Sequence, residues 1–317
     1  MTLINNKNNR FHSQSGLSLI ELMIAIPLSL MVMGTIFKIF VSSMQGVHLQ
    51  NSFARVQEKG RIGAELIIRD IRGADYWGCA RDFTSIANSL NITPVSLGAG
   101  VEGIGDAHSI EIDGISVKDE TDILTIRGAR SIEGVKIETA MLTTQSDISV
   151  TTDNTIDKGE ILLISDCNKA DLFMNTHAAT SSDGSIRYAT SDKVDGIENT
   201  TPYLSKAYTK NAQILSLFSK TYFIGLNEDL NYSLYRSDGG NAEELIRGIN
   251  DLQLLYGEDT SQNDSVDTFV DATSVTNMDN VRSIKVSLTT EDGEGVAGSP
   301  LERTYHITTN IRNRTLN

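Results

Sequence analysis

The stretch "GLSLIELMIAIPLSLMVMGTIF", Gly16 to Phe37, decides the architecture of the chain, because it is long and apolar enough to cross a membrane. Of the 21 residues from Leu17 to Phe37, 15 are Ala, Val, Ile, Leu, Met or Phe. At 1.5 Å per residue they would form a helix of about 31 Å, close to the hydrocarbon thickness of a bilayer. The run therefore predicts one transmembrane helix, which Pro27 is expected to kink or locally loosen.

Glu21 is the one carboxylate inside this apolar run. A charged side chain at the centre of a bilayer costs about 2.5 to 3.5 kcal/mol on insertion scales, so an acid there is a candidate functional residue. A plain membrane anchor followed by an ordinary amphipathic helix would explain the length and pattern of the segment. It would not explain Glu21.

The charges that flank the run predict its orientation. Lys7 and Arg10 precede it without any acid, so the N-terminus is expected in the cytoplasm and everything after Lys38 on the exported side. An ordinary secretory signal would have a shorter apolar core and a small-residue cleavage site after it. The candidate processing signal lies instead before the run, at Gly16.

The helical pattern continues beyond the membrane. Apolar or small residues recur in steps of three and four, and charged residues fall between them, which predicts an amphipathic helix; the face comprises Phe53, Val56, Gly60, Gly63, Ile67 and Ile71. Glu65 and Arg69 are spaced to form an ion pair, and Gly73 is a plausible stop. The predicted helix has a transmembrane half, 17–41, and an amphipathic half, 42–72, with a length of about 84 Å.

Residues 73–317 read as a globular, β-rich head. Short β-like runs alternate with turn residues, and we predict strands at 121–128, 135–142, 160–166, 212–226, 232–237, 251–257, 281–290 and 304–311. The expected fold class is α+β, with a long N-terminal helix packed on a mostly antiparallel sheet. The long polar loops 179–200 and 257–280 are either contact surfaces for partners or simply solvated.

Composition argues against several classes of function. The 27 Lys and Arg against 41 Asp and Glu give a net charge of -14, so no general affinity for nucleic acid is expected. The five histidines are scattered, with neither an H-E-x-x-H nor a G-x-S-x-G motif, so the sequence predicts no enzyme and no cofactor. Asp153–Glu160 and Asp259–Asp267 partly follow a calcium loop but lack its glycine, so we expect no metal.

The chain has two cysteines, Cys79 and Cys167. Their separation fits neither a zinc site nor a C-x-x-C redox site. In an exported protein they suggest one disulfide, worth about 4 to 5 kcal/mol in the chain-entropy model. Two unrelated buried thiols are the alternative.

The segment "GLSLIELMIA" resembles the class III signal of type IV prepilins. The resemblance implies that residues 1–16 are a leader, that a prepilin peptidase cuts after Gly16, and that Leu17 becomes the N-methylated first residue. Most prepilins begin there with Phe, so Leu17 is a departure. In pilin filaments the acid at the position of Glu21 pairs with the N-terminal amine of a neighbouring subunit, which gives a buried acid a partner.

Further segments resemble the PilW family of minor pilins: "RVQEKGRIGAELIIRDIRGADYWGC", "SDCNKADLF", "YSLYR", "IRGINDLQLLYGED", "VRSIKVSLTT" and "TTNIRNR". This resemblance implies a subunit that joins other minor pilins in a priming or tip complex of a type IV pilus. Its implied partners are other minor pilins, the major pilin, the prepilin peptidase and the inner-membrane assembly platform, with a tip adhesin as a further possible partner.

The implied location is the inner membrane, single-pass with a periplasmic head, and then the pilus. Two alternatives stay open. One is a minor pseudopilin of a type II secretion system, and the other is a membrane-anchored adhesin or binding protein that never enters a filament.

Overall fold

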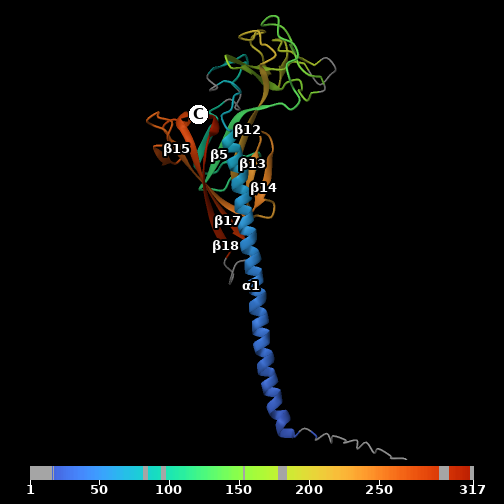
Figure 1. Cartoon of the computed structure of the whole chain (residues 1–317), viewed down its shortest axis with the longest axis vertical. Coiled ribbons are helices and arrows are strands. Elements are labelled where there is room, and N and C mark those ends of the chain that lie inside the picture. Colours follow the sequence, from blue (N-terminus) through green and yellow to red (C-terminus); the bar gives the residue numbers. More distant parts are fainter. Residues whose placement is uncertain are drawn as a thin grey trace, which may run out of the picture. The chain divides into compact units, whose positions relative to one another are not determined.

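The computed structural model describes residues 16, 18–80, 85–93, 98–152, 154–177, 184–292 and 300–314. The chain divides into two compact units, Met1–Phe53 and Ala54–Asn317. It contains one long helix and mostly antiparallel strands (Figure 1), so the expected α+β class is confirmed. The second unit begins inside the helix, so its core includes the end of the helix as well as the strands.

Helix α1 spans Leu19–Gly73, 55 residues, against the predicted 17–72. Pro27 lies inside it, and the helix continues on both sides of this residue. It ends at Gly73, where the Ala74 N–H donates to the carbonyl of Ile71 at 3.1 Å. The expected Glu65–Arg69 pair is wrong, because Glu65 instead accepts from Arg61 at 3.1 Å, one turn toward the N-terminus.

The larger sheet has eight strands, in the order β1-β8-β7-β12-β13-β14 with β5 paired to β12 and β2 paired to β5. All of its pairings are antiparallel except β1 with β8. Their bounds are β1 Ile86–Asn88, β2 Val101–Ala107, β5 Thr121–Ser131, β7 Ile161–Asp166, β8 Lys169–Met174, β12 Gln213–Leu226, β13 Tyr232–Ser237 and β14 Ala242–Arg247.

The smaller sheet has four antiparallel strands in the order β16-β15-β17-β18. They are β15 Ile249–Glu258, β16 Thr268–Val270, β17 Val281–Asp292 and β18 Leu301–Asn310. Three two-stranded ribbons, β3–β4, β6–β9 and β10–β11, lie in the connections; their strands are Glu111–Ile112, Ile115–Ser116, Ile148–Ser149, Ser185–Ile186, Lys193–Val194 and Ile197–Glu198. There are two short 3-10 turns. Met278–Asn280 directly precedes β17, and Arg312–Arg314 follows β18.

The main core joins the C-terminal part of α1 to both sheets. Val56, Gly60, Gly63, Ile67 and Ile71 are buried, which confirms the predicted period of the helix over these residues. Ile67 and Ile71 share one cluster with side chains from both sheets, namely Leu124 and Ile126 of β5, Tyr222 and Ile224 of β12, Leu252 and Leu254 of β15, and Val286 and Leu288 of β17. Phe53, which the pattern also placed on this face, lies in the first unit and is exposed, so the prediction is wrong at this residue.

Two further clusters cover the two faces of the β8-β7-β12 part of the larger sheet. Leu162 and Ile164 point into one cluster and Leu163 into the other, because side chains alternate across a strand. Residues 137–156 and 186–212 supply the cover on the first face. Trp77, directly after α1, packs on the second face with Leu172 and Leu215.

Most predicted strands are confirmed, and one is wrong. Residues 135–142 form no strand, and Ile137 makes only an isolated bridge to Val150. Ile137 and Met141 are buried, so their apolar pattern reports packing and not strand pairing. The sequence missed β2, β8 and β14; in β2, Gly103 interrupts the apolar pattern where the Tyr256 hydroxyl leaves no room for a Cβ.

Candidate assembly site

The three residues of the predicted processing and pairing site, Gly16, Leu17 and Glu21, lie close together in the sequence. Residues 1–15 and Leu17 lie outside the described residues, so the leader and the new N-terminus remain expectations. Gly16 is exposed, and a Cβ there would meet no other atom within 4 Å. Glu21 is the third residue of α1 and is exposed.

Glu21 has a local role that the sequence analysis missed. Its Oε2 accepts a hydrogen bond from the Ser18 N–H at 3.0 Å, and the Ser18 carbonyl accepts from Leu22 at 3.2 Å. Ser18 is therefore the N-cap, and Glu21 is the acid that reaches back to it in a capping box. The signal was readable as Ser-x-x-Glu just before the apolar run.

The first unit presents its apolar side chains to the outside. Every large apolar side chain from Leu19 to Phe40 is at least 50% exposed. The hydroxyls of Ser29 and Thr35 donate to the carbonyls of Ile26 and Met31 at 2.8 and 2.9 Å, so these polar groups are satisfied inside the helix. The helix is long and apolar enough to cross a membrane, which is compatible with membrane anchoring.

At the other end of α1, Asp75 fixes the chain where it leaves the helix. Asp75 has a φ of 60°, and its carboxylate accepts from the Trp77 indole N–H at 2.8 Å and from Arg314 Nε at 2.5 Å. Trp77 and Arg314 are both buried. This contact joins the helix exit to the last residues that the structure describes, and it sets the path of the chain toward Cys79.

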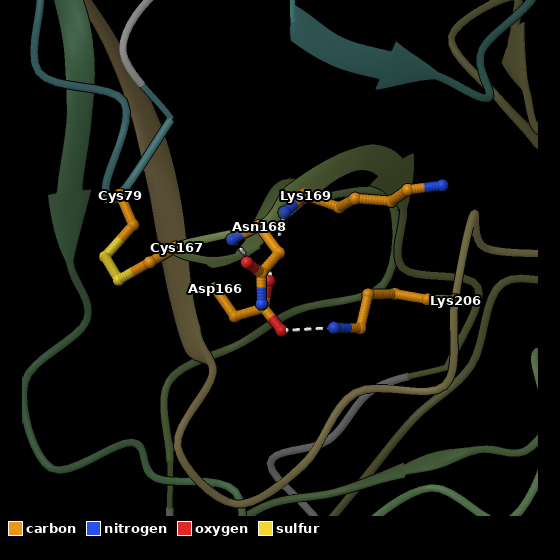
Figure 2. Close-up of a disulfide and its surroundings, with 6 residues drawn as sticks. All are labelled: Cys79, Asp166, Cys167, Asn168, Lys169 and Lys206. Carbon is orange, nitrogen blue, oxygen red and sulfur yellow. Dashed lines mark hydrogen bonds and ion pairs between the residues drawn. A yellow bond between two sulfur atoms is a disulfide. The ribbon is translucent and has the colours of Figure 1, made fainter.

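Cys79 and Cys167 form a disulfide, as expected from the sequence. Their Cα atoms are 4.5 Å apart, and 88 positions separate them in the chain. Figure 2 shows that the bond connects the loop after α1 to the turn between β7 and β8. Both cysteines are exposed, so the alternative of two unrelated buried thiols is wrong.

Asp166 organises the β7–β8 turn beside the disulfide (Figure 2). Its Oδ1 accepts from the N–H groups of Asn168 and Lys169 at 3.0 Å each, and its Oδ2 accepts from Lys206 Nζ at 2.6 Å. Burial raises the pKa of Asp166, but the bonds from Lys206 and the two N–H groups outweigh it, and the pKa is lowered. The turn that carries Cys167 is therefore held by an ionised carboxylate.

The acidic loop 257–280 is organised by its own carboxylates. Asp259 accepts from the N–H groups of Asn263 and Asp264 at 3.0 and 2.9 Å, and Asp267 accepts from Ser261 at 2.8 Å. Among the residues that the structure describes, no three His, Cys, Asp or Glu side chains are grouped to hold a metal. Asp153, the first residue of the other calcium-like loop, lies outside the described residues.

A known protein family matches the segment from the middle of β12 through β18. Residues 221–312 match the model of the family described as Type IV Pilus-assembly protein W, PilW. We refer to residues 221–312, the part that matches, as the PilW segment. The predicted resemblance to PilW is thereby confirmed over this part of the chain, and it supports a role in type IV pilus assembly. Comparisons with curated proteins and with solved structures give no match.

The PilW segment contains β13 to β18, including the whole smaller sheet. It supplies most of the side chains that pack against Ile67 and Ile71 of α1. The matched part of the chain therefore supplies most of the core that packs against the C-terminal part of α1. The match suggests, in general terms, an interaction with pilus components.

Proposed function

We propose that this protein is a minor pilin. It would join other minor pilins in a complex that primes the assembly of a type IV pilus or lies at its tip. Prepilin peptidase would cut after Gly16, and the new N-terminus at Leu17 would be methylated. The observation that carries the proposal is the combination of a PilW segment with an exposed apolar helix that bears Glu21 in its first turn. The proposed role is structural and not enzymatic.

A helix that must leave a bilayer needs a second apolar environment. In a filament, the helices of neighbouring subunits would supply it, since the described residues leave the apolar surface from Leu19 to Phe40 exposed. The Glu21 carboxylate, which now accepts from the Ser18 N–H, would instead accept from the amine of a neighbouring subunit's first residue, or accept from both. Such a pair would select the register of docking, because a subunit one turn out of place leaves both charges unpaired.

A minor pseudopilin of a type II secretion system is the second candidate, since it would use the same helix and the same pairing. The PilW segment favours the pilus. An anchored adhesin outside any filament has no use for Glu21 beyond helix capping.

Processing tests the proposal first. We expect mass spectrometry of the mature protein from membranes to find a first residue of N-methyl-Leu17. An intact Met1 start, or a cut beyond Phe37, would contradict it.

The pairing role of Glu21 can be separated from its capping role. Glu21→Gln keeps an oxygen that can accept from the Ser18 N–H but removes the charge, whereas Glu21→Ala removes both. If the charge pairs with a neighbour, both variants should lose co-purification with partner pilins by at least about a hundredfold, since breaking a buried pair costs about 3 to 5 kcal/mol.

Glu58→Ala is the matched control, because Glu58 is an exposed acid of α1 outside the apolar run. It should leave co-purification unchanged. Full capture by Glu21→Gln together with loss by Glu21→Ala would show that Glu21 acts only as a cap.

A further inference from the structure

The C-terminal end of α1 lies beside β5 and β12 (Figure 1). A cationic pocket lies there, with a volume of about 430 Å³, within the range of ligand-binding clefts. Five basic side chains and one acidic side chain line it, in a chain with a net charge of -14. The basic residues are Arg69, Arg72, Arg130, Lys220 and Arg312.

Asp70, the one acid of the pocket, is already engaged. Its Oδ2 accepts from Lys220 Nζ at 2.8 Å and from the Tyr222 hydroxyl at 2.6 Å, and its Oδ1 lies 3.8 Å from Arg69. The C-terminal end of α1 adds about half a negative charge. Together they offset about one and a half positive charges, so the pocket keeps a positive excess even when only the four basic side chains Arg69, Arg72, Arg130 and Lys220 are counted.

Arg72 and Arg130 account for part of this excess. Arg72 Nε donates to the Thr309 hydroxyl at 3.1 Å, and Arg130 Nε donates to the Ser216 hydroxyl at 3.3 Å. Arg130 also attracts the Glu160 carboxylate electrostatically. Within the described part of the chain, neither arginine forms an ion pair, and both are exposed. Each guanidinium therefore keeps donors for a carboxylate that comes from outside.

The pocket also has an apolar component. Phe218, Tyr76 and Ala129 line it, and Phe218 packs against the main core. Lys220 Nζ lies 5.7 Å from the centre of the Phe218 ring, so one of the cations is already placed over an aromatic face. A ligand that matches the pocket carries negative charge next to an apolar group.

We propose that this pocket binds an acidic segment of a partner polypeptide, with its carboxylates on Arg72 and Arg130 and an apolar side chain against Phe218. An extended polyanion, such as nucleic acid or an anionic bilayer, fits less well, because the net charge of the chain repels it outside the pocket. The inference rests on the proposed function only in taking that partner to be another subunit of the pilus.

The test uses the full-length chain in detergent micelles and a labelled peptide in which two aspartates flank a phenylalanine, with blocked ends. The comparison peptide carries asparagines in place of the aspartates. We expect the aspartate peptide to bind at least about tenfold more tightly by fluorescence anisotropy, because hydrogen bonds to charged groups contribute about 1.5 to 3 kcal/mol each.

The variant Arg72→Gln/Arg130→Gln should lose that preference, with binding of the aspartate peptide weakened at least about tenfold. Arg61→Gln/Arg247→Gln removes the same charge from two exposed arginines outside the pocket. It should stay within about twofold of the unaltered chain. Arg72→Lys/Arg130→Lys should be intermediate, because an ammonium keeps the charge but lacks the planar fork.

Equal weakening in the pocket variant and its control would overturn the proposal, since only long-range charge would then be at work. Equal binding of the two peptides would do the same. So would inorganic phosphate that displaces the aspartate peptide at an equal or lower concentration, because the pocket would then be a phosphate site. The N-terminal mass of the same preparation reports on pilin processing separately, so loss of peptide recognition with normal cleavage after Gly16 refutes the pocket alone.

Discussion

Glu21 has a local role that the structure shows and an intermolecular role that we propose. In the isolated chain its carboxylate accepts from the Ser18 N–H and caps α1. The cap satisfies one of the N–H groups that a helix N-terminus leaves open, and a negative charge there also favours the helix dipole. A neighbouring amine would therefore compete with a hydrogen bond, and not with water alone.

Asp166 makes a second prediction at the scale of the residue. Its folded pKa is lowered below the usual 3.8, so its contribution to stability is present above about pH 4 and is lost as the pH falls through the folded pKa. We expect Asp166→Asn to lower the free energy of unfolding at neutral pH by about 1 kcal/mol or less. Urea unfolding at several pH values should show this difference shrinking toward acid.

The comparison must be a difference between two chains, because other acids act in the opposite direction. Burial is the main cause that raises the pKa of Asp122 and of Glu160. Their ionised forms oppose folding, so their protonation adds stability as the pH falls. A constant gap between Asp166→Asn and the unaltered chain from neutral to acid pH would contradict the predicted role of the Asp166 carboxylate.

At the scale of the element, α1 depends on two glycines where it meets the sheets. A Cβ at Gly60 would overlap with the ring of Tyr305 on β18, and one at Gly63 would lie 2.9 Å from Ile249 Cδ1 on β15. Glycine costs up to about 1 kcal/mol relative to alanine inside a helix. The close approach of helix and sheet explains why the sequence carries that cost at these two positions.

Gly60→Ala is therefore expected to destabilise the protein although it improves helix propensity. Overpacking costs about 1 to 3 kcal/mol, against a gain of at most about 1 kcal/mol. Thermal unfolding should show a lower midpoint. Gly46→Ala is the control, since a Cβ there meets nothing within 4 Å and should leave the midpoint unchanged or raise it slightly.

The double variant Gly60→Ala/Tyr305→Ala tests the cause. Removing the Tyr305 ring should reduce the penalty of the added methyl group, so the two changes should not be additive. Full additivity would place the effect of Gly60 elsewhere than in the contact with β18.

At the scale of the whole molecule, the disulfide connects two regions that are distant in the sequence. It joins the loop after α1 to the β7–β8 turn, and so the helix exit to the sheet that lies between two hydrophobic clusters. The exposed position of both cysteines makes the bond accessible to a reductant.

Cys79→Ser/Cys167→Ser is expected to lower the free energy of unfolding by up to about 4 to 5 kcal/mol, because a closed loop of 88 positions no longer limits the unfolded chain. Chemical unfolding of the unaltered and variant chains measures the loss. Hydrogen exchange should find it concentrated in β1, β7 and β8. Free thiols in protein from the periplasm, or equal stability of the two chains, would contradict the prediction.

Local patterns were enough to predict α1, its buried face apart from Phe53, the fold class, the disulfide and seven of the eight proposed strands. These features depend on residues close together in the chain, or, for the disulfide, on there being only two cysteines. The 135–142 segment failed as a strand because burial of Ile137 and Met141 under a second cluster produces the same apolar pattern as strand pairing. β2 was missed because Gly103 interrupts its apolar pattern. The reason for this glycine is the nearby hydroxyl of Tyr256, which is far away in the sequence.

The proposed roles of Gly16, Leu17 and Glu21 rest on the order of residues alone, since a processing signal and a charge in an apolar run are local features. The cationic pocket does not. Arg72, Arg130 and Lys220 come from α1, β5 and β12, and only the packing of those elements brings their charges around Phe218. The same holds for the contact of Asp75 with Arg314, because an ion pair between residues 239 positions apart is a property of the folded chain and not of either segment.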